Sequence, residues 1–311
     1  MLKKIFLVPC LLIAGFIHGQ TVDSLLKQAG KLASDKNYKE ALGIYNKVWE
    51  KDSLNFDLYL ERGTVYYELR EVENAFNDYT KAIKLRPASA EPYHRRAILM
   101  MAIMYTEEAI MDNTKAINLA TNDTMRMICF MNRGNAKQQK RDFQGAFEDY
   151  SRAYLYDTSD MTILNNMATV LDELGRVDEC LQYLQKVIQR DPTFVGAYVN
   201  VGFQYTKLQR YKEAIVYFDK ALSLQKDEPL TLNNRGLARY HLKDYTGALE
   251  DINKSLALYP DNSYAFKNRA LVHLAQKQKE KACADLQKAI DLEFTKMYGS
   301  EVEELLKANC K

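Results

Sequence analysis

The sequence predicts an all-α fold, a right-handed α-solenoid of about eight helix–turn–helix repeats. Small residues recur along the chain at steps of 34 residues, with a single step of 37. A period of this size is typical of one repeated pair of helices. The recurring small residues are Ala41, Ala75, Ala109, Ala146, Cys180, Ala214, Ala248 and Ala282. Because stacked repeats enclose no central cleft, we expect function to come from an extended surface.

Placing these small residues at position 20 of a 34-residue repeat brings other positions into phase. Positions 8 and 27 are also small, whereas positions 4 and 24 are mostly bulky. Two helices that cross closely need small side chains at the crossing and large ones beside it. The predicted repeats span residues 22–55, 56–89, 90–123, 127–160, 161–194, 195–228, 229–262 and 263–296, within a solenoid of residues 22–296.

The pattern resembles the tetratricopeptide repeat (TPR) family, in an exported Gram-negative bacterial form. Residues 198–205 (YVNVGFQY), followed by Ala214, Phe218 and Ala221, fit that family closely. A few positions depart from it. Asn113 occupies position 24 of the third repeat, Lys137 and Arg239 occupy position 11, and three extra residues precede Met127. We expect weaker packing near residues 113–137.

Arginine at position 7 occurs only where aspartate occupies position 23. Five repeats carry this combination: Arg62/Asp78, Arg96/Asp112, Arg133/Asp149, Arg235/Asp251 and Arg269/Asp285. The other three carry Gln28/Ile44, Met167/Tyr183 and Val201/Tyr217. Their joint presence and absence predicts an Arg–carboxylate bridge between the two helices of a repeat, which is a structural role.

The N-terminus has the pattern of a secretory signal peptide. Lys3 and Lys4 precede an uncharged stretch from Ile5 to Ile17 that is too short for an ordinary membrane span. We therefore predict a signal peptide over residues 1–19 and a periplasmic or outer-surface-associated protein, with lipidation at Cys10 as an alternative. Removing the signal leaves as many basic as acidic residues, so there is no basic surface for nucleic acid.

Cysteines and a short acidic motif mark the C-terminus. Ser300 to Glu303 reads as a capping box, and it predicts a capping helix over residues 300–309. In an exported chain Cys283 and Cys310 can form a disulfide that holds this helix down. The alternative is a pair of reduced thiols.

The residues predict no enzyme activity, no cofactor and no metal site. His94, His241 and His273 lie in different repeats. No metal-ligand, phosphate-loop or nucleophile motif appears. Acidic groups such as Glu71 and Glu73 fit solvated helix surfaces.

One column of amides stands out on the predicted concave face. Position 6 of five consecutive repeats is asparagine: Asn132, Asn166, Asn200, Asn234 and Asn268. An amide both donates and accepts hydrogen bonds, so it can pair with either peptide group of an extended chain. Layers about 10 Å apart, against about 3.3 Å per extended residue, give roughly one asparagine for every three peptide residues.

The column resembles the asparagine ladder of O-GlcNAc transferases, although no transferase domain is present. Asparagine is also common at this position throughout the TPR family, whatever the ligand. The prediction is a non-enzymatic protein–protein interaction scaffold that binds a polypeptide segment in its groove. The alternative is a structural subunit of an envelope or secretion assembly that binds through its convex face.

Overall fold

The computed structural model describes residues 21–310, and this part of the chain is helical with no strand. The predicted all-α class is therefore confirmed. The signal peptide predicted for residues 1–19, and Cys10 within it, lie outside the described residues.

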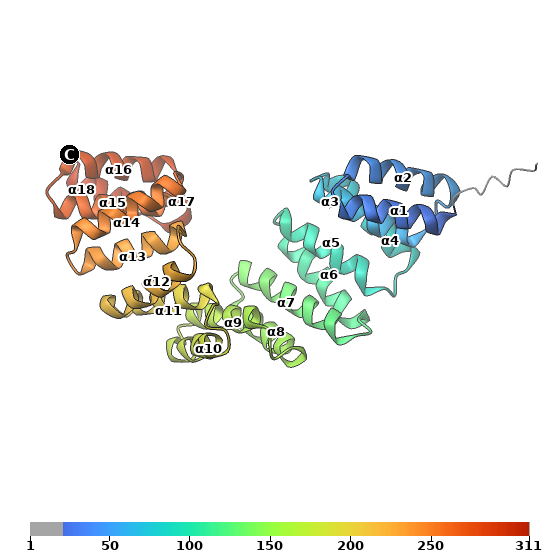
Figure 1. Ribbon diagram of the computed structural model, residues 1–311, viewed down its shortest axis with the longest axis horizontal. Coiled ribbons are helices and arrows are strands. Elements are labelled where there is room, and N and C mark those ends of the chain that lie inside the picture. Colours follow the sequence, from blue (N-terminus) through green and yellow to red (C-terminus); the bar gives the residue numbers. More distant parts are fainter. Residues whose placement is uncertain (1–20, 311) are drawn as a thin grey trace, which may run out of the picture. The chain divides into compact units, whose positions relative to one another are not determined.

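The chain divides between Thr121 and Asn122 into two units, here called the N-terminal unit and the C-terminal unit. The N-terminal unit contains α1 (Val22–Ser34), α2 (Tyr38–Lys51), α3 (Phe56–Glu68), α4 (Val72–Leu85), α5 (Ala90–Ala102) and α6 (Thr106–Leu119) (Figure 1). The C-terminal unit contains α7 (Asp123–Gln139), α8 (Phe143–Tyr156), α9 (Met161–Glu173), α10 (Val177–Arg190), α11 (Val195–Lys207), α12 (Tyr211–Leu224), α13 (Pro229–His241), α14 (Tyr245–Leu258), α15 (Ser263–Ala275), α16 (Lys279–Asp291), α17 (Phe294–Tyr298) and α18 (Glu301–Asn309).

From α1 to α16 the helices pack in consecutive pairs, and each pair belongs to one 34-residue repeat. We call the first helix of a pair helix A and the second helix B. Within each unit, helix B also packs against helix A of the next repeat. Within each unit, every repeat therefore contacts its neighbours along the chain, as in a solenoid.

A left-handed residue at position 15 ends helix A in every repeat. In the second repeat the Arg70 N–H donates to the Tyr67 carbonyl and the Glu71 N–H to the Tyr66 carbonyl, both at 2.9 Å. These bonds close a Schellman motif, which satisfies carbonyls left free at the helix end. The position-15 residues, all with φ between 58° and 71°, are Lys36, Arg70, Met104, Arg141, Gly175, Gln209, Lys243 and Lys277. Because only one of them is glycine, the turn has little signal in the sequence.

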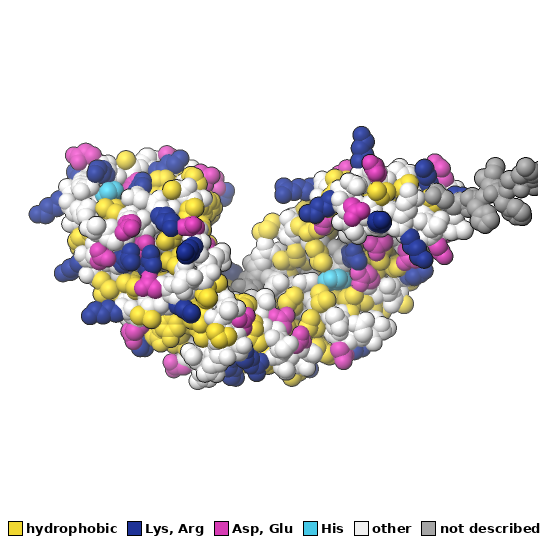
Figure 2. Space-filling view, in the orientation of Figure 1, with side chains coloured by type: hydrophobic (Ala, Val, Ile, Leu, Met, Phe, Trp, Pro, Cys, Tyr) yellow, Lys and Arg dark blue, Asp and Glu magenta, His cyan; other side chains and the backbone are white. Residues whose placement is uncertain are grey.

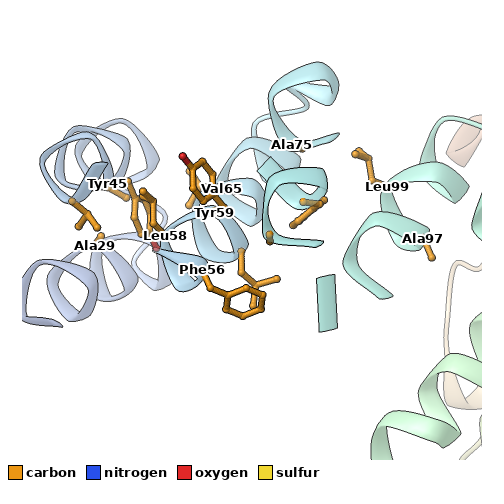
Figure 3. Close-up of a cluster of buried hydrophobic side chains, with 14 of the residues drawn as sticks. Ala29, Tyr45, Phe56, Leu58, Tyr59, Val65, Ala75, Ala97 and Leu99 are labelled. Atoms are coloured by element: carbon orange, nitrogen blue, oxygen red, sulfur yellow. The ribbon is translucent and has the colours of Figure 1, made fainter. Parts of the chain in front are cut away.

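Helices A and B interlock through the small positions predicted above. All eight residues at position 20 are buried, with at most 1 % of their surface exposed. A Cβ atom added to Gly202 would lie 2.6 Å from the Phe218 ring, and one added to Gly134 would lie 2.7 Å from the Tyr150 ring. In the N-terminal unit the same arrangement places Ala29, Tyr45 and Tyr59 in one apolar core that extends to Leu99 (Figure 3). The small residues therefore let large side chains fill the space between the helices.

All five predicted Arg–Asp bridges form between helices A and B. In each, Nε and Nη2 of the arginine donate to the two carboxylate oxygens, as between Arg62 and Asp78 at 2.8 and 2.9 Å. The remaining four pairs have the same geometry. The aspartates are 3–8 % exposed, so each carboxylate is desolvated and paired. This prediction is confirmed.

The arginines also reach the preceding repeat, a contact that the sequence analysis missed. In four repeats Nη1 donates to the side chain at position 25 of the helix B before it. The pairs are Arg62 to Asn46, Arg96 to Thr80, Arg235 to Asp219 and Arg269 to Asn253. One guanidinium therefore joins three helices.

Basic residues at position 11 strengthen this network instead of weakening the packing. Lys137 Nζ lies 2.9 Å from Asp149, and Arg239 Nη1 lies 2.9 Å from Asp251. Both side chains also donate to a backbone carbonyl at the start of helix B. At Lys137, within the stretch where weaker packing is expected, and at Arg239 outside it, the basic group finds an already buried carboxylate.

The three-residue insertion is helical. Helix α7 begins at Asp123, and the Asn122 side chain accepts a hydrogen bond from the Met125 N–H. The extra residues lengthen α7 at its first turn, so that it has 17 residues where the other A helices have 13. Asn113 at position 24 is fully buried, and its Nδ2 donates to the Ala109 carbonyl.

The C-terminal helices pack against the last repeat. Cys283 and Cys310 are disulfide-bonded, with Cα atoms 5.7 Å apart. Val302 of α18 and Phe294 of α17 are buried with the core of α15 and α16. The capping box does not form. Ser300 precedes α18, but its hydroxyl donates to the Glu304 side chain and caps no backbone N–H.

Candidate peptide-binding groove

The asparagine column lies on successive A helices of the C-terminal unit. Asn132, Asn166, Asn200 and Asn234, on α7, α9, α11 and α13, are half-buried. Their amides combine partial burial with access to solvent, so they remain available to a ligand.

The fifth column residue, Asn268 of α15, is enclosed with none of its surface exposed. Its Oδ1 atom has no hydrogen-bond partner. The preceding residue, Lys267, forms an ion pair of 2.9 Å with Glu301 of α18, and Tyr264 contacts the rings of α17. The C-terminal helices therefore lie against this end of α15. Asn268 differs from the expectation of an accessible ladder residue.

Two column residues are held in place by asparagines at position 5 of the preceding repeat. Asn200 Nδ2 donates to Asn165 Oδ1 at 2.9 Å, and Asn268 Nδ2 donates to Asn233 Oδ1 at 3.0 Å. This contact orients the Asn200 side chain and leaves its Oδ1 available to accept. The sequence analysis did not single out Asn165, although the Asn-Asn pairs at 165–166 and 233–234 are a visible signal.

Apolar side chains border the column on α11 and α13. Phe203 and Leu230 are 44 % and 51 % exposed, and hydrophobic side chains are visible over this region in Figure 2. Lys207 of α11 is paired with Asp172 of α9 and lies 5.8 Å from the Phe203 ring. The charges of Lys207 and Asp172 therefore offset each other.

The N-terminal unit presents a charged surface at the same repeat positions. Position 6 is Glu61 on α3 and Arg95 on α5. Arg95 donates to Glu91 and to Thr64, each at 2.7 Å, and lies 4.0 Å from Glu61. Burial opposes the charge on Arg95, but the bond to Glu91 prevails and raises its pKa. This arginine is already committed to partners within the unit.

The histidines do not come together. Burial lowers the pKa of His94, His241 and His273, so each favours the neutral form. Residues 21–310 contain no group of three His, Cys, Asp or Glu side chains placed to hold a metal ion. In that same range, no helix is both long enough and apolar enough to cross a membrane.

Two further cysteines in the described chain are reduced. Cys129 and Cys180 are buried. Burial raises the pKa of the Cys180 thiol to about 12, which keeps it uncharged and unreactive.

A stack of helix pairs with one face open to a ligand is the architecture of a repeat-type interaction protein. Sequence models described as "Tetratricopeptide repeat" match residues 56–89, 162–194, 195–228, 229–262 and 267–296, which together make up more than half of the chain. The chain belongs to the tetratricopeptide repeat family. Proteins of this family are interaction scaffolds and are generally non-enzymatic.

The similar proteins agree on the fold. The chain is 34 % identical over 101 residues to Hsp70-Hsp90 organizing protein 1 of Arabidopsis thaliana, a match that covers 29 % of this chain and 18 % of that protein. The chain thus spans less than a fifth of the length of this curated relative. The crystal structure of the APC/C hetero-tetramer Cut9-Hcn1 covers 95 % of this chain and 57 % of its own, with a TM-score of 0.66 at 20 % identity. A tetratricopeptide repeat protein from Parabacteroides merdae covers 94 % of this chain and 100 % of its own, with a TM-score of 0.54 at 16 % identity. At these identities the two structures show the fold alone.

Proposed function

We propose that the C-terminal unit binds an extended polypeptide through Asn132, Asn166, Asn200 and Asn234. The observation that carries this proposal is the regular placement of four half-buried amides on four successive A helices, beside exposed apolar side chains. The amides pair with peptide groups and are indifferent to sequence, while Phe203 and Leu230 add apolar contact area. Asn268 is left out of the site because it is enclosed.

Affinity accumulates over several weak contacts. Each net hydrogen bond is worth about 1 kcal/mol, so loss of three amides raises Kd roughly a hundredfold when the bonds add. The Asn165 contact pre-orients Asn200, which lowers the entropy lost when the ligand binds.

We also propose that the protein acts outside the cytoplasm, in the periplasm or at the outer surface. The arguments are the signal-like pattern of residues 1–19 and the bonded Cys283–Cys310 pair, because disulfides persist in oxidising compartments. Fractionation of the native host tests this directly. Recovery of the protein from the cytoplasm with residues 1–19 intact contradicts it.

The groove is tested with paired peptide probes. One is a pool of short, acetylated and amidated peptides of mixed sequence; the other has the same side chains with alternate backbone nitrogens methylated. A variant with Asn166, Asn200 and Asn234 changed to Ala should lose binding of the first pool, and the wild type should bind the methylated pool weakly. Methylation removes the backbone donors, so it isolates recognition of the peptide groups.

The matched control changes three exposed amides on the outer surface of α10, namely Gln182, Gln185 and Gln189, to Ala. This control removes the same number of amides from the same unit and should leave Kd unchanged. Equal Kd values for the triple asparagine variant, the control and the wild type reject the groove as the site. Thermal unfolding of both variants should match the wild type, since alanine is the better helix former.

A further inference from the structure

The helix A face of the N-terminal unit differs in charge from that of the C-terminal unit. Positions 2, 6, 9 and 13 share one face of an α-helix. In the N-terminal unit they include five acidic residues (Asp23, Asp57, Glu61, Glu68 and Glu91) and two basic ones (Lys27 and Arg95). At the same positions in α7, α9, α11, α13 and α15, the only acidic residue is Glu173, and the basic ones are Lys207 and His241. The two units therefore present different chemistry to a ligand.

A pocket of about 400 Å³ lies between α1 and α3 on this face. Its floor is apolar, formed by Gly30, Ala33 and Val65, and Glu61 and Glu68 line its edge. Lys36 and Tyr38 also border the pocket, with Lys36 exposed at the turn after α1. An apolar floor with a carboxylate edge suits the alkyl stem and cationic head of lysine or arginine.

The two carboxylates are not used up by the protein's own cations. Glu68 is exposed and makes no hydrogen bond or ion pair with the described residues, and Glu61 approaches Arg95 only to 4.0 Å. Arg95 is already bound to Glu91 and Thr64. A cation in the pocket would therefore meet two carboxylates, of which only Glu61 has an internal ion pair, the long contact with Arg95.

A second pocket, of about 510 Å³, lies one layer away between α3 and α5. Tyr67, Val72, Leu99 and Ile103 give it an apolar lining, while Glu68 and Arg70 carry opposite charges at its edge. Most of its lining residues are apolar or aromatic, so the second pocket suits an apolar side chain. Neighbouring helix layers are about 10 Å apart, which an extended chain covers in about three residues.

We propose that the N-terminal unit binds a protein segment in which a lysine or arginine and an apolar residue lie about three residues apart. The basic side chain enters the pocket beside Glu61 and Glu68, and the apolar side chain enters the pocket lined by Leu99 and Ile103. The argument is the charge complementarity of the first pocket together with the apolar lining of the second. This surface is separate from the amide groove of the C-terminal unit.

The test uses the full chain and short fluorescent peptides, acetylated and amidated, in which Lys and Leu stand three residues apart in either order. Matched probes carry Gln in place of Lys or Ser in place of Leu. The Lys/Leu probe should bind, and both substituted probes should bind at least fivefold more weakly. A double variant, Glu61→Gln with Glu68→Gln, should raise Kd for the Lys/Leu probe about fivefold or more, because each exposed ion pair contributes modestly.

Glu40→Gln with Glu50→Gln is the control, since both glutamates are exposed on α2 outside the pockets and the change in net charge is the same. This control should leave Kd within twofold of the wild type. Equal weakening in both double variants would reduce the effect to net charge and overturn the proposal. Equal affinity for the Lys and Gln probes, or displacement of the probe by free spermidine at the same concentration as by the unlabelled peptide, would also overturn it.

The result is independent of the amide groove. The triple asparagine variant should bind the Lys/Leu probe as the wild type does, and the Glu61/Glu68 variant should bind the mixed peptide pool normally. Failure of either site is therefore distinguishable from failure of the other.

Discussion

The Arg62–Asp78 bridge predicts a contrast between breaking a buried ion pair and replacing it. Both side chains are largely buried, with 13 % and 8 % of their surfaces exposed. Burial raises the pKa of Asp78 above its usual value even though Arg62 opposes the shift. Desolvation therefore disfavours the charged form of this carboxylate. Asp78→Asn leaves the guanidinium without its carboxylate. We expect it to destabilise the N-terminal unit by about 3 kcal/mol.

Another repeat of the same protein shows which apolar residues can replace the Arg–Asp pair. Repeat six has Val201 and Tyr217 at the positions of Arg62 and Asp78, and tyrosine at position 11 in both repeats. The Tyr217 ring lies 5.4 Å from that of Tyr205. The double variant Arg62→Val with Asp78→Tyr should therefore stay within about 1 kcal/mol of the wild type, because apolar residues often replace a buried pair without loss.

Hydrogen exchange of α3 and α4 is the appropriate assay, supported by urea unfolding, because repeat arrays need not unfold in a single step. Asp178→Asn, at an exposed residue on α10, is the control for removing one carboxylate. A double variant that loses as much protection as Asp78→Asn refutes the reasoning, since it would give the bridge a large net contribution. If Asp78→Asn destabilises the unit by less than about 1 kcal/mol, the claim that breaking the buried pair is costly is also refuted.

Three further predictions concern packing, protonation and the C-terminus. Gly202→Ala should destabilise the C-terminal unit by about 1–3 kcal/mol because the new methyl group meets an aromatic ring. Gly43 has open space around it, so Gly43→Ala should stabilise the N-terminal unit by up to about 1 kcal/mol. In thermal unfolding, the first variant should lower the transition temperature and the second should raise it. Burial lowers the pKa of His94, so below about pH 6.5 the unfolded chain takes up a proton that the native state resists, and the N-terminal unit should lose stability from pH 7 to pH 5. His94→Gln should flatten that dependence in hydrogen exchange of α5 and α6, and an unchanged slope would contradict it. The double variant Cys283→Ser with Cys310→Ser should lose roughly 3 kcal/mol of stability, because the disulfide links residues 27 apart in sequence. Hydrogen exchange in α18 should be faster in this variant than in the wild type, and a reductant should speed exchange in the wild type alone.

The repeat phase and the Arg–Asp bridges were predictable from the sequence because both depend on short-range regularities. A small residue at position 20 is needed where helices A and B of one repeat cross, and an aspartate 16 residues after an arginine pairs with it across the same two helices. The same regularity predicts that Asn132, Asn166, Asn200 and Asn234 lie on the same face of successive A helices.

The missed features depend on contacts that no single repeat contains. Seven of the eight left-handed turn residues, Lys36 and Arg70 among them, are not glycine, because hydrogen bonds at the helix end compensate for the strain. The burial of Asn268 depends on α17 and α18, and α17 lacks the repeat pattern altogether. The predicted capping box does not form, because the Ser300 hydroxyl donates a hydrogen bond to the Glu304 side chain.

The arginine that joins three helices is present at some contacts between successive repeats and absent from others, so these contacts differ in the interactions that stabilise them. Arg62, Arg96 and Arg269 donate a hydrogen bond to a neutral side chain of the repeat before them, and Arg235 forms an ion pair with Asp219 there. Met167 and Val201 give the fifth and sixth repeats no such link. Apolar contact weakens on cooling and strengthens in sulfate, while partly exposed ion pairs weaken as salt is added. Among the guanidinium links, the Arg235–Asp219 ion pair is therefore the one expected to weaken as salt is added, and the Lys207–Asp172 pair should respond in the same way between the fifth and sixth repeats.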